Sequence, residues 1–202
     1  MTDTKEVLEF WFGEDSADLD NATIAGRQSG LWWGKSEATD TEIRRRFEPL
    51  VQAAGADNLD EWKASPAGWL ALILLLDQFP RNIFRTTPDM FAFDPKARTL
   101  TVDGIDAGID RKLRLIERVF FYLPLEHAES PDDQARCVAL MARLVDEAPG
   151  PEKQVFESFV GYAEAHKRII DRFGRFPHRN EILGRESSAE EIEFLKQPGS
   201  SF

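Results

Sequence analysis

The chain contains little cysteine and little positive charge. Its 202 residues include one cysteine, Cys137, so no disulfide can form within the chain, and a lone thiol is typical of a reducing compartment. Lys and Arg total 25 against 36 Asp and Glu, which gives a formal net charge of -11 at pH 7. Because nucleic acids bind to positive surfaces, this charge argues against nucleic acid as the main partner.

The sequence also has no long apolar run. The longest extends from Trp69 to Leu76 and is far shorter than the roughly 20 residues that cross a bilayer. Residues 1–4, Met-Thr-Asp-Thr, include no basic residue, and no long apolar segment follows them, so we expect no signal peptide. With 42% hydrophobic and 30% charged residues, the composition is that of a globular protein. We therefore expect a soluble, cytoplasmic protein with no membrane partner.

Several motifs of enzymes and metalloproteins are absent from the sequence. It has no G-x-G-x-x-G or G-x-x-x-x-G-K loop for phosphates, and no G-x-S-x-G nucleophile motif. Glu126 and His127 are adjacent rather than one helical turn apart, and no His-Glu-x-x-His or paired-cysteine spacing occurs. We therefore expect neither a metal nor a cofactor.

Helix-start signals recur along the whole chain, whereas strand and hairpin patterns are missing. Three Ser/Thr-Pro pairs and two capping boxes mark the predicted starts: Ser65-Pro66, Thr87-Pro88, Ser130-Pro131, Thr39 with Glu42, and Ser188 with Glu191. Thr4 is expected to cap a first short helix that Gly13 ends. The pattern predicts one all-α domain over residues 1–202, with roughly eight helices joined by short connections.

The central element of this prediction is the run from Trp69 to Leu76. It is apolar on every side, as in a helix that is buried all round, and its Leu and Ala content favours helix over strand.

Proline lacks the backbone donor and restricts the residue before it. The Phe-Pro pairs at Pro80 and Pro177 therefore predict chain reversals, Pro124 predicts a helix end, and Pro49 a kink.

Two segments lack this regularity. Residues 14–35 are rich in Asp, Gly and Ser, and we interpret them as a loop anchored by Leu31, Trp32 and Trp33. Residues 196–202 follow the last predicted helix and are expected to be a frayed tail.

Four stretches of the chain resemble a known family. They are Leu76-Asp77-Gln78-Phe79-Pro80-Arg81-Asn82, Tyr122 to His127, Asp133-Gln134, and Arg172 to Asn180. Together they are similar to the marks of a mainly bacterial family of domains of unknown function, numbered 924, over roughly Val7 to Leu195. The resemblance implies a right-handed superhelix of antiparallel helices, similar to tetratricopeptide-repeat (TPR) proteins with degenerate repeats. It implies no reaction or ligand. Ala128 departs from the small hydroxyl residue expected after the Glu-His pair.

The polar residues of these stretches are the predicted binding site. Arginine carries a fork of five donors that suits carboxylates and phosphates, so we expect a small anionic or zwitterionic metabolite, or a peptide, as partner. The candidate residues are Asp77, Arg81, Asn82, Glu126, His127, Arg175, His178 and Arg179. The alternative is that Asp-Arg and Glu-Arg pairs only lock helix ends together, as tertiary ion pairs often do.

Two other functions remain open from the sequence. Glu126 and His127, with His166 or His178 nearby, supply groups for acid-base chemistry of the kind that hydrolases use, because histidine titrates near neutral pH. His166 lies on an apolar helical stripe and is interpreted as a core residue. A superhelix also presents a concave groove for protein partners, and Trp32, Trp33 and Trp62 are possible lining residues.

Overall fold

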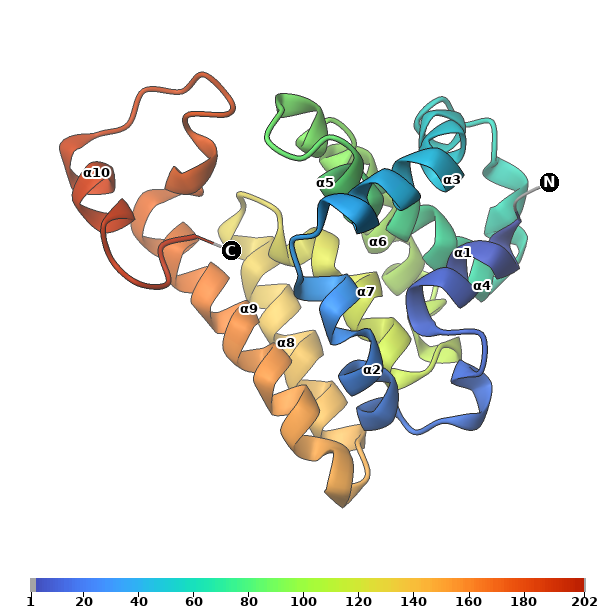
Figure 1. Cartoon of the computed structure of the whole chain (residues 1–202). Coiled ribbons are helices and arrows are strands. Elements are labelled where there is room, and N and C mark those ends of the chain that lie inside the picture. The colour runs from blue at the N-terminus through green and yellow to red at the C-terminus, as the bar shows by residue number, and fades with distance from the viewer. Residues whose placement is uncertain (1–2, 202) are drawn as a thin grey trace.

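The computed structural model describes residues 3–201, and this range is all-helical with no strand. Its α-helices are α1 Thr4–Phe12, α2 Asn21–Trp33, α3 Glu37–Gly55, α4 Pro66–Ile73, α5 Phe79–Ile83, α6 Asp94–Asp106, α7 Leu115–Glu126, α8 Pro131–Glu147, α9 Lys153–Phe173 and α10 Ala189–Leu195 (Figure 1). Short 3-10 helices lie at Ser16–Asp18, Asp60–Ala64, Pro88–Phe91, Asp110–Lys112, Gly150–Glu152 and Pro177–Arg179, and a π-helical turn at Leu74–Gln78. No helix in this range is both long and apolar enough to span a membrane.

Local capping chemistry positions several helix starts as predicted. The hydroxyl groups of Ser65, Ser130 and Ser188 each accept a hydrogen bond from the backbone N–H three residues later, which satisfies a donor that the helix leaves unpaired. Two predicted caps are wrong by a few residues. Asp3 rather than Thr4 caps α1, and Ser36 rather than Thr39 caps α3.

The predicted central element is confirmed as the buried centre of the fold. Helix α4, the π-helical turn and α5 follow one another from Pro66 to Ile83, and every residue from Leu70 to Pro80 is buried. Phe79 lies with its ring centroid 4.9 Å from that of Phe47 on α3 and 5.4 Å from that of Trp11 on α1. Helices from distant parts of the sequence therefore pack around this segment.

The chain reversal predicted at Pro80 is wrong. Pro80 lies in the first turn of α5, where a missing N–H costs least, and the widened π-helical turn leads into it without a reversal. The side chain of Arg81 donates to the Asp77 carbonyl oxygen at 2.5 Å. Pro124 lies within the last turn of α7, which continues to Glu126, and α3 continues through Pro49.

Residues 14–35 are not a loop. Helix α2 occupies Asn21–Trp33, and the Asp20 carboxylate caps it by accepting from the Thr23 N–H at 2.7 Å. Only Ile24 and Trp32 of this helix are buried, so the apolar periodicity is weak. The predicted Thr87-Pro88 helix start is a 3-10 turn instead, and α6 begins six residues further on at Asp94.

The C-terminal part of the chain extends from the main body of helices. Helices α8 and α9 lie side by side as a long hairpin, and α10 lies beyond the end of α9 (Figure 1). A small second cluster of buried residues, Ile169, Ile170 and Phe176, anchors this end, with Phe173 and Phe194 packed against it. The segment after α10 is more ordered than a frayed tail, because Ser200 is buried and donates to the Leu195 carbonyl oxygen. Residue 202 lies outside the described range.

Candidate functional site

A buried polar cluster surrounds the carboxylate of Asp77, which lies in the π-helical turn and is fully buried. His127, at the end of α7, places its Nδ1 atom 2.8 and 3.0 Å from the two Asp77 carboxylate oxygens. Gln78 Nε2 donates to the same carboxylate at 2.6 Å, and Arg81 NH1 lies 3.4 Å from it. A π-helical turn is an uncommon backbone form that often occurs at functional sites. Here it directs Asp77 toward the end of α7.

Arg81 joins this carboxylate to a second one. Its guanidinium donates two parallel hydrogen bonds to Asp94, at 2.9 and 3.1 Å. Asp94 is the first residue of α6, so the pair ties α5 to the start of α6. Arg81 is therefore fully engaged, with one carboxylate bound in bidentate fashion and another nearby.

Arg179 lies close to Arg81 and Asp94 but makes fewer hydrogen bonds and ion pairs than Arg81 does. Its guanidinium carbon lies 4.4 Å from the ring centroid of Phe176 and 4.7 Å from that of Phe91. Its ion-pair partner is Asp94, at 3.7 Å, and within residues 3–201 the buried Nε atom has no hydrogen-bond partner. Burial, together with the nearby Arg81 charge, lowers the pKa of Arg179 to about 10. The side chain is still a cation at neutral pH, with donor capacity unused.

The protonation of the Asp77–His127 pair follows from its surroundings. Burial acts to raise the Asp77 pKa, but the Arg81 charge and the hydrogen bonds from His127 and Gln78 outweigh it, so the pKa lies below its ordinary value. Burial and the Arg81 charge lower the pKa of His127, although Asp77 acts against this. At neutral pH an ionised Asp77 therefore accepts from the Nδ1–H of a neutral imidazole. In this tautomer Nε2 carries the lone pair.

Glu126 forms a second group behind this pair. Burial and the negative charge of Asp77 raise its pKa to about 8, so the carboxyl group is mostly protonated at neutral pH. His166 Nδ1 lies 3.2 Å from Glu126 Oε1 and 2.9 Å from the Tyr162 carbonyl oxygen, to which it must donate. Burial lowers the pKa of His166 to about 3. We therefore assign two neutral groups here, because burial disfavours the charged form of each.

The remaining predicted residues are divided between this cluster and other networks. His178 lies beside it, with its ring centroid 5.6 Å from that of Phe176, and burial lowers its pKa to about 4. Asn82 belongs elsewhere, because it donates to Asp40 on α3 at 2.9 Å. Arg175 is also separate: it binds Glu191 of α10 in bidentate fashion at 2.7 and 2.8 Å.

The sequence reasoning missed three residues of the site. Phe91 and Asp94 carried no signal, since neither adjoins the motif residues in the sequence and only the fold brings them to Arg179. Glu129 accepts from the Phe176 N–H at 2.8 Å and from Arg185 at 2.7 and 2.9 Å. This carboxylate fixes the loop that carries Arg179. Its position two residues after His127 was the available clue.

A cavity lies along α9, and the residues of this cluster do not line it. It has a volume of about 740 Å³ and is lined by none of the eight predicted residues. Within residues 3–201, no three His, Cys, Asp or Glu side chains converge as a metal site requires. Cys137 is buried, and burial raises its pKa, so it is not a reactive thiol.

The three tryptophans proposed for a groove differ in exposure. Trp32 is 7% exposed, and its Nε1 donates to the Trp11 carbonyl oxygen at 2.8 Å. This residue belongs to the core and cannot line a groove. Trp62 is partly buried against the core, whereas Trp33 is 53% exposed.

The fold and the site together define a helical protein with a buried Asp-His-Arg network. The chain belongs to the family described as "Bacterial protein of unknown function (DUF924)", whose model matches residues 7–199. It is also similar to a solved structure of a protein of unknown function from Agrobacterium tumefaciens, with 40% identity and a TM-score of 0.74 over 88% of this chain and 99% of that one. No curated protein in the comparison matches it.

Proposed function

We propose that this protein binds a small anionic or zwitterionic ligand at the polar cluster of Asp77, Arg81, His127 and Arg179. The observation that carries the proposal is the unused donor capacity of Arg179. Its side chain is 8% exposed and its ion-pair partner Asp94 lies 3.7 Å away, yet its Nε has no hydrogen-bond partner among the described residues. Buried polar groups are nearly always hydrogen-bonded. A carboxylate or phosphate oxygen is the natural partner for a guanidinium in this position.

The surroundings of Arg179 support an anion rather than a neutral ligand. Arg81 is close enough for its charge to lower the Arg179 pKa, so an anion between them would relieve this repulsion. The rings of Phe91 and Phe176 hold the guanidinium and limit the rotamer entropy that is lost on binding.

The proposal is tested by thermal shift and calorimetry with inorganic phosphate, acetate, citrate and amino acids. We expect at least one of these to bind the wild type, and Arg179→Gln to weaken that binding by roughly 10- to 100-fold, since charge-assisted hydrogen bonds are lost. Arg27→Gln is the matched control, because Arg27 forms an exposed pair with Asp15 elsewhere. Equal affinities of wild type and Arg179→Gln, or no binding at all, would reject the proposal.

A second candidate function is acid-base catalysis of the kind found in hydrolases. The favouring observation is the Asp77–His127 pair, because the 2.8 Å contact fixes one imidazole tautomer and leaves Nε2 as the basic atom. Glu126, protonated at neutral pH, is the adjacent proton donor. Hydrolysis of p-nitrophenyl acetate and p-nitrophenyl phosphate by wild type and His127→Gln tests this function. Equal rates of the two proteins exclude it for these substrates.

We also propose a TPR-like arrangement of the helices, a groove for protein partners and a cytoplasmic location. A TPR-like right-handed superhelix and a concave protein-binding groove rest on the resemblance alone, and exposed Trp33 is the one aromatic side chain of the three that favours such a groove. A cytoplasmic location rests on the lone, buried Cys137. Cell fractionation followed by detection of the native chain tests the location.

A further inference from the structure

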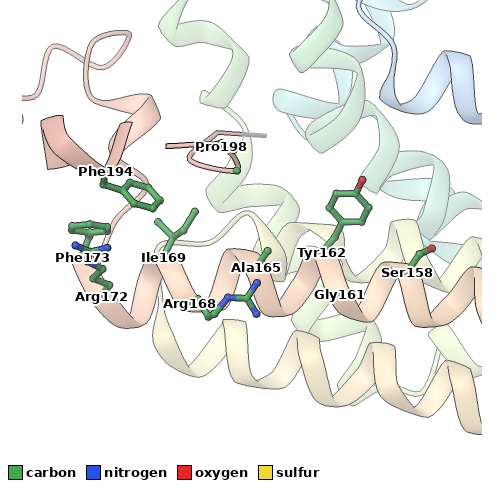
Figure 2. A pocket seen from close by; sticks show the side chains of 11 residues that line it. Ser158, Gly161, Tyr162, Ala165, Arg168, Ile169, Arg172, Phe173, Phe194 and Pro198 are labelled. Carbon is green, nitrogen blue, oxygen red and sulfur yellow. The ribbon is translucent and has the colours of Figure 1, made fainter. Parts of the chain in front are cut away.

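A cavity lies along α9, and it is lined by none of the residues of the polar cluster. This cavity of about 740 Å³ has α9 as its floor, and the opposite wall is formed by Phe194 of α10 and the following turn with Pro198 (Figure 2). Cavities of roughly 300–1,000 Å³ are typical of sites for small molecules. None of the residues that line this cavity belongs to the polar cluster, so the two sites share no side chain.

The lining of this cavity is mainly apolar and aromatic. Ile169 points toward Phe194 and Pro198 (Figure 2), and the ring centroids of Phe173 and Phe194 are 5.0 Å apart. Tyr162 is 61% exposed, an unusual exposure for a large aromatic side chain next to a cavity. The lining therefore offers apolar surface that a ligand would remove from water.

Two arginines, Arg168 and Arg172, line the cavity, and one of them has no ion-pair partner among the described residues. Glu190 neutralises Arg172 at 2.8 Å. Arg168 is exposed, and within residues 3–201 it forms no ion pair or side-chain hydrogen bond. One unpaired cation beside an apolar surface is the pattern that suits a molecule with an apolar body and an anionic head.

A glycine also lines the cavity. Gly161 lies in the interior of α9, where glycine costs about 1 kcal/mol relative to alanine, and a Cβ there would meet no atom within 4 Å. Packing in the folded chain therefore does not require a glycine at this position.

From these observations we propose that the α9 cavity binds a small amphipathic anion, such as a medium-chain or aromatic carboxylate or sulfonate. The apolar body lies along Ile169, Phe173 and Phe194, and Arg168 binds the head group. This site goes beyond the function proposed for the polar cluster and does not depend on it.

The probes for the test are 8-anilino-1-naphthalenesulfonate and its uncharged counterpart N-phenyl-1-naphthylamine. Both fluoresce when bound to apolar surface, and they differ in the sulfonate. We expect Arg168→Gln to weaken binding of the sulfonate about tenfold, as loss of a charge-assisted contact does, and to leave binding of the neutral probe unchanged. An equal effect on both probes, or none on either, overturns the role of Arg168.

Ala165→Trp tests whether the probes occupy this cavity. Ala165 lines it one helical turn before Ile169 and Arg168, so the indole should occupy the proposed binding volume and abolish binding of both probes while the variant still unfolds cooperatively. Ala38→Trp is the control, because Ala38 is an exposed alanine within α3. We expect it to bind both probes like the wild type. Binding that survives Ala165→Trp, or no probe binding by a cooperatively folded wild type, overturns the proposal.

Discussion

The substitution Glu126→Gln tests the assignment of a neutral carboxyl group in the interior. Glu126 is 4% exposed, and its pKa rises from 4.5 to about 8 because of burial and the nearby Asp77 charge. Between these two pH values the folded chain keeps a proton that the unfolded chain releases. Stability therefore falls as the pH rises through this window. Glutamine has nearly the same shape but does not titrate, so this decrease is absent from the variant.

The magnitude follows from the difference between the two pKa values. Each pH unit is worth about 1.4 kcal/mol, so the free energy of unfolding of Glu126→Gln relative to wild type should rise by about 3–5 kcal/mol between pH 4.5 and 8. A constant offset from the exchanged hydrogen-bonding group does not affect this slope. Titrating groups that lie far from Glu126 cancel in the comparison.

The assay is urea unfolding at several pH values, followed by tryptophan fluorescence and circular dichroism. Glu190→Gln is the control, because Glu190 is exposed and paired with Arg172 on the surface; its difference from wild type should stay within about 1 kcal/mol at every pH. A wild-type to Glu126→Gln difference that does not change between pH 5 and 8 would refute the assignment of a neutral Glu126.

Two further substitutions test the packing around the site. Asp77→Asn removes a fully buried carboxylate from an ion-pair network and should lower the free energy of unfolding by about 3–5 kcal/mol. Asp106→Asn removes one partner of an exposed pair and should lower it by less than about 1 kcal/mol. Similar decreases for both variants in urea unfolding would contradict the argument from burial. Gly104→Ala places a Cβ 2.5 Å from a ring atom of Phe121 and should lower the free energy of unfolding by about 1–3 kcal/mol, while Gly161→Ala should raise it by about 0.5–1 kcal/mol. Thermal unfolding of the two variants distinguishes the two signs, and destabilisation by Gly161→Ala would contradict the open space around Gly161.

The parts of the fold that follow from local chemistry could be predicted from the sequence. Ser65, Ser130 and Ser188 cap their helices because a short hydroxyl side chain reaches the N–H three residues on, whatever the tertiary context. The apolar run from Trp69 to Leu76 predicted the buried centre because no other placement removes so many leucines from water.

Other parts depended on tertiary structure that no local pattern reveals. Helix α2 was missed because two buried residues give little periodicity, although Asp20 ahead of Thr23 was a usable cap signal. The reversal expected at Pro80 did not occur because Pro80 lies in the first turn of α5, where a missing N–H costs least. A π-helical turn has no recognised sequence signature.

The candidate site, like the fold, could be predicted only in part. The resemblance to the family grouped Asp77, Arg81, His127 and Arg179, and the fold brings these four into one network. Arg175 was grouped with them because it is close in sequence to Arg179, but the left-handed turn at Gly174 ends α9 and directs Arg175 to Glu191 of α10. Asp94 was missed because its role depends on where the start of α6 lies relative to α5.

Binding of an anion by Arg179 is tested most directly through the arginine Nε–H resonances in a ¹H–¹⁵N spectrum. The Arg179 signal is assigned by its loss in Arg179→Lys, and the protein is titrated with inorganic phosphate, acetate and citrate. We predict that at least one of these anions shifts the Arg179 signal in a saturable manner, while the signal of Arg27, paired on the surface with Asp15, stays in place. An Arg179 signal that none of them moves, or that moves only in parallel with Arg27, would contradict the proposed site.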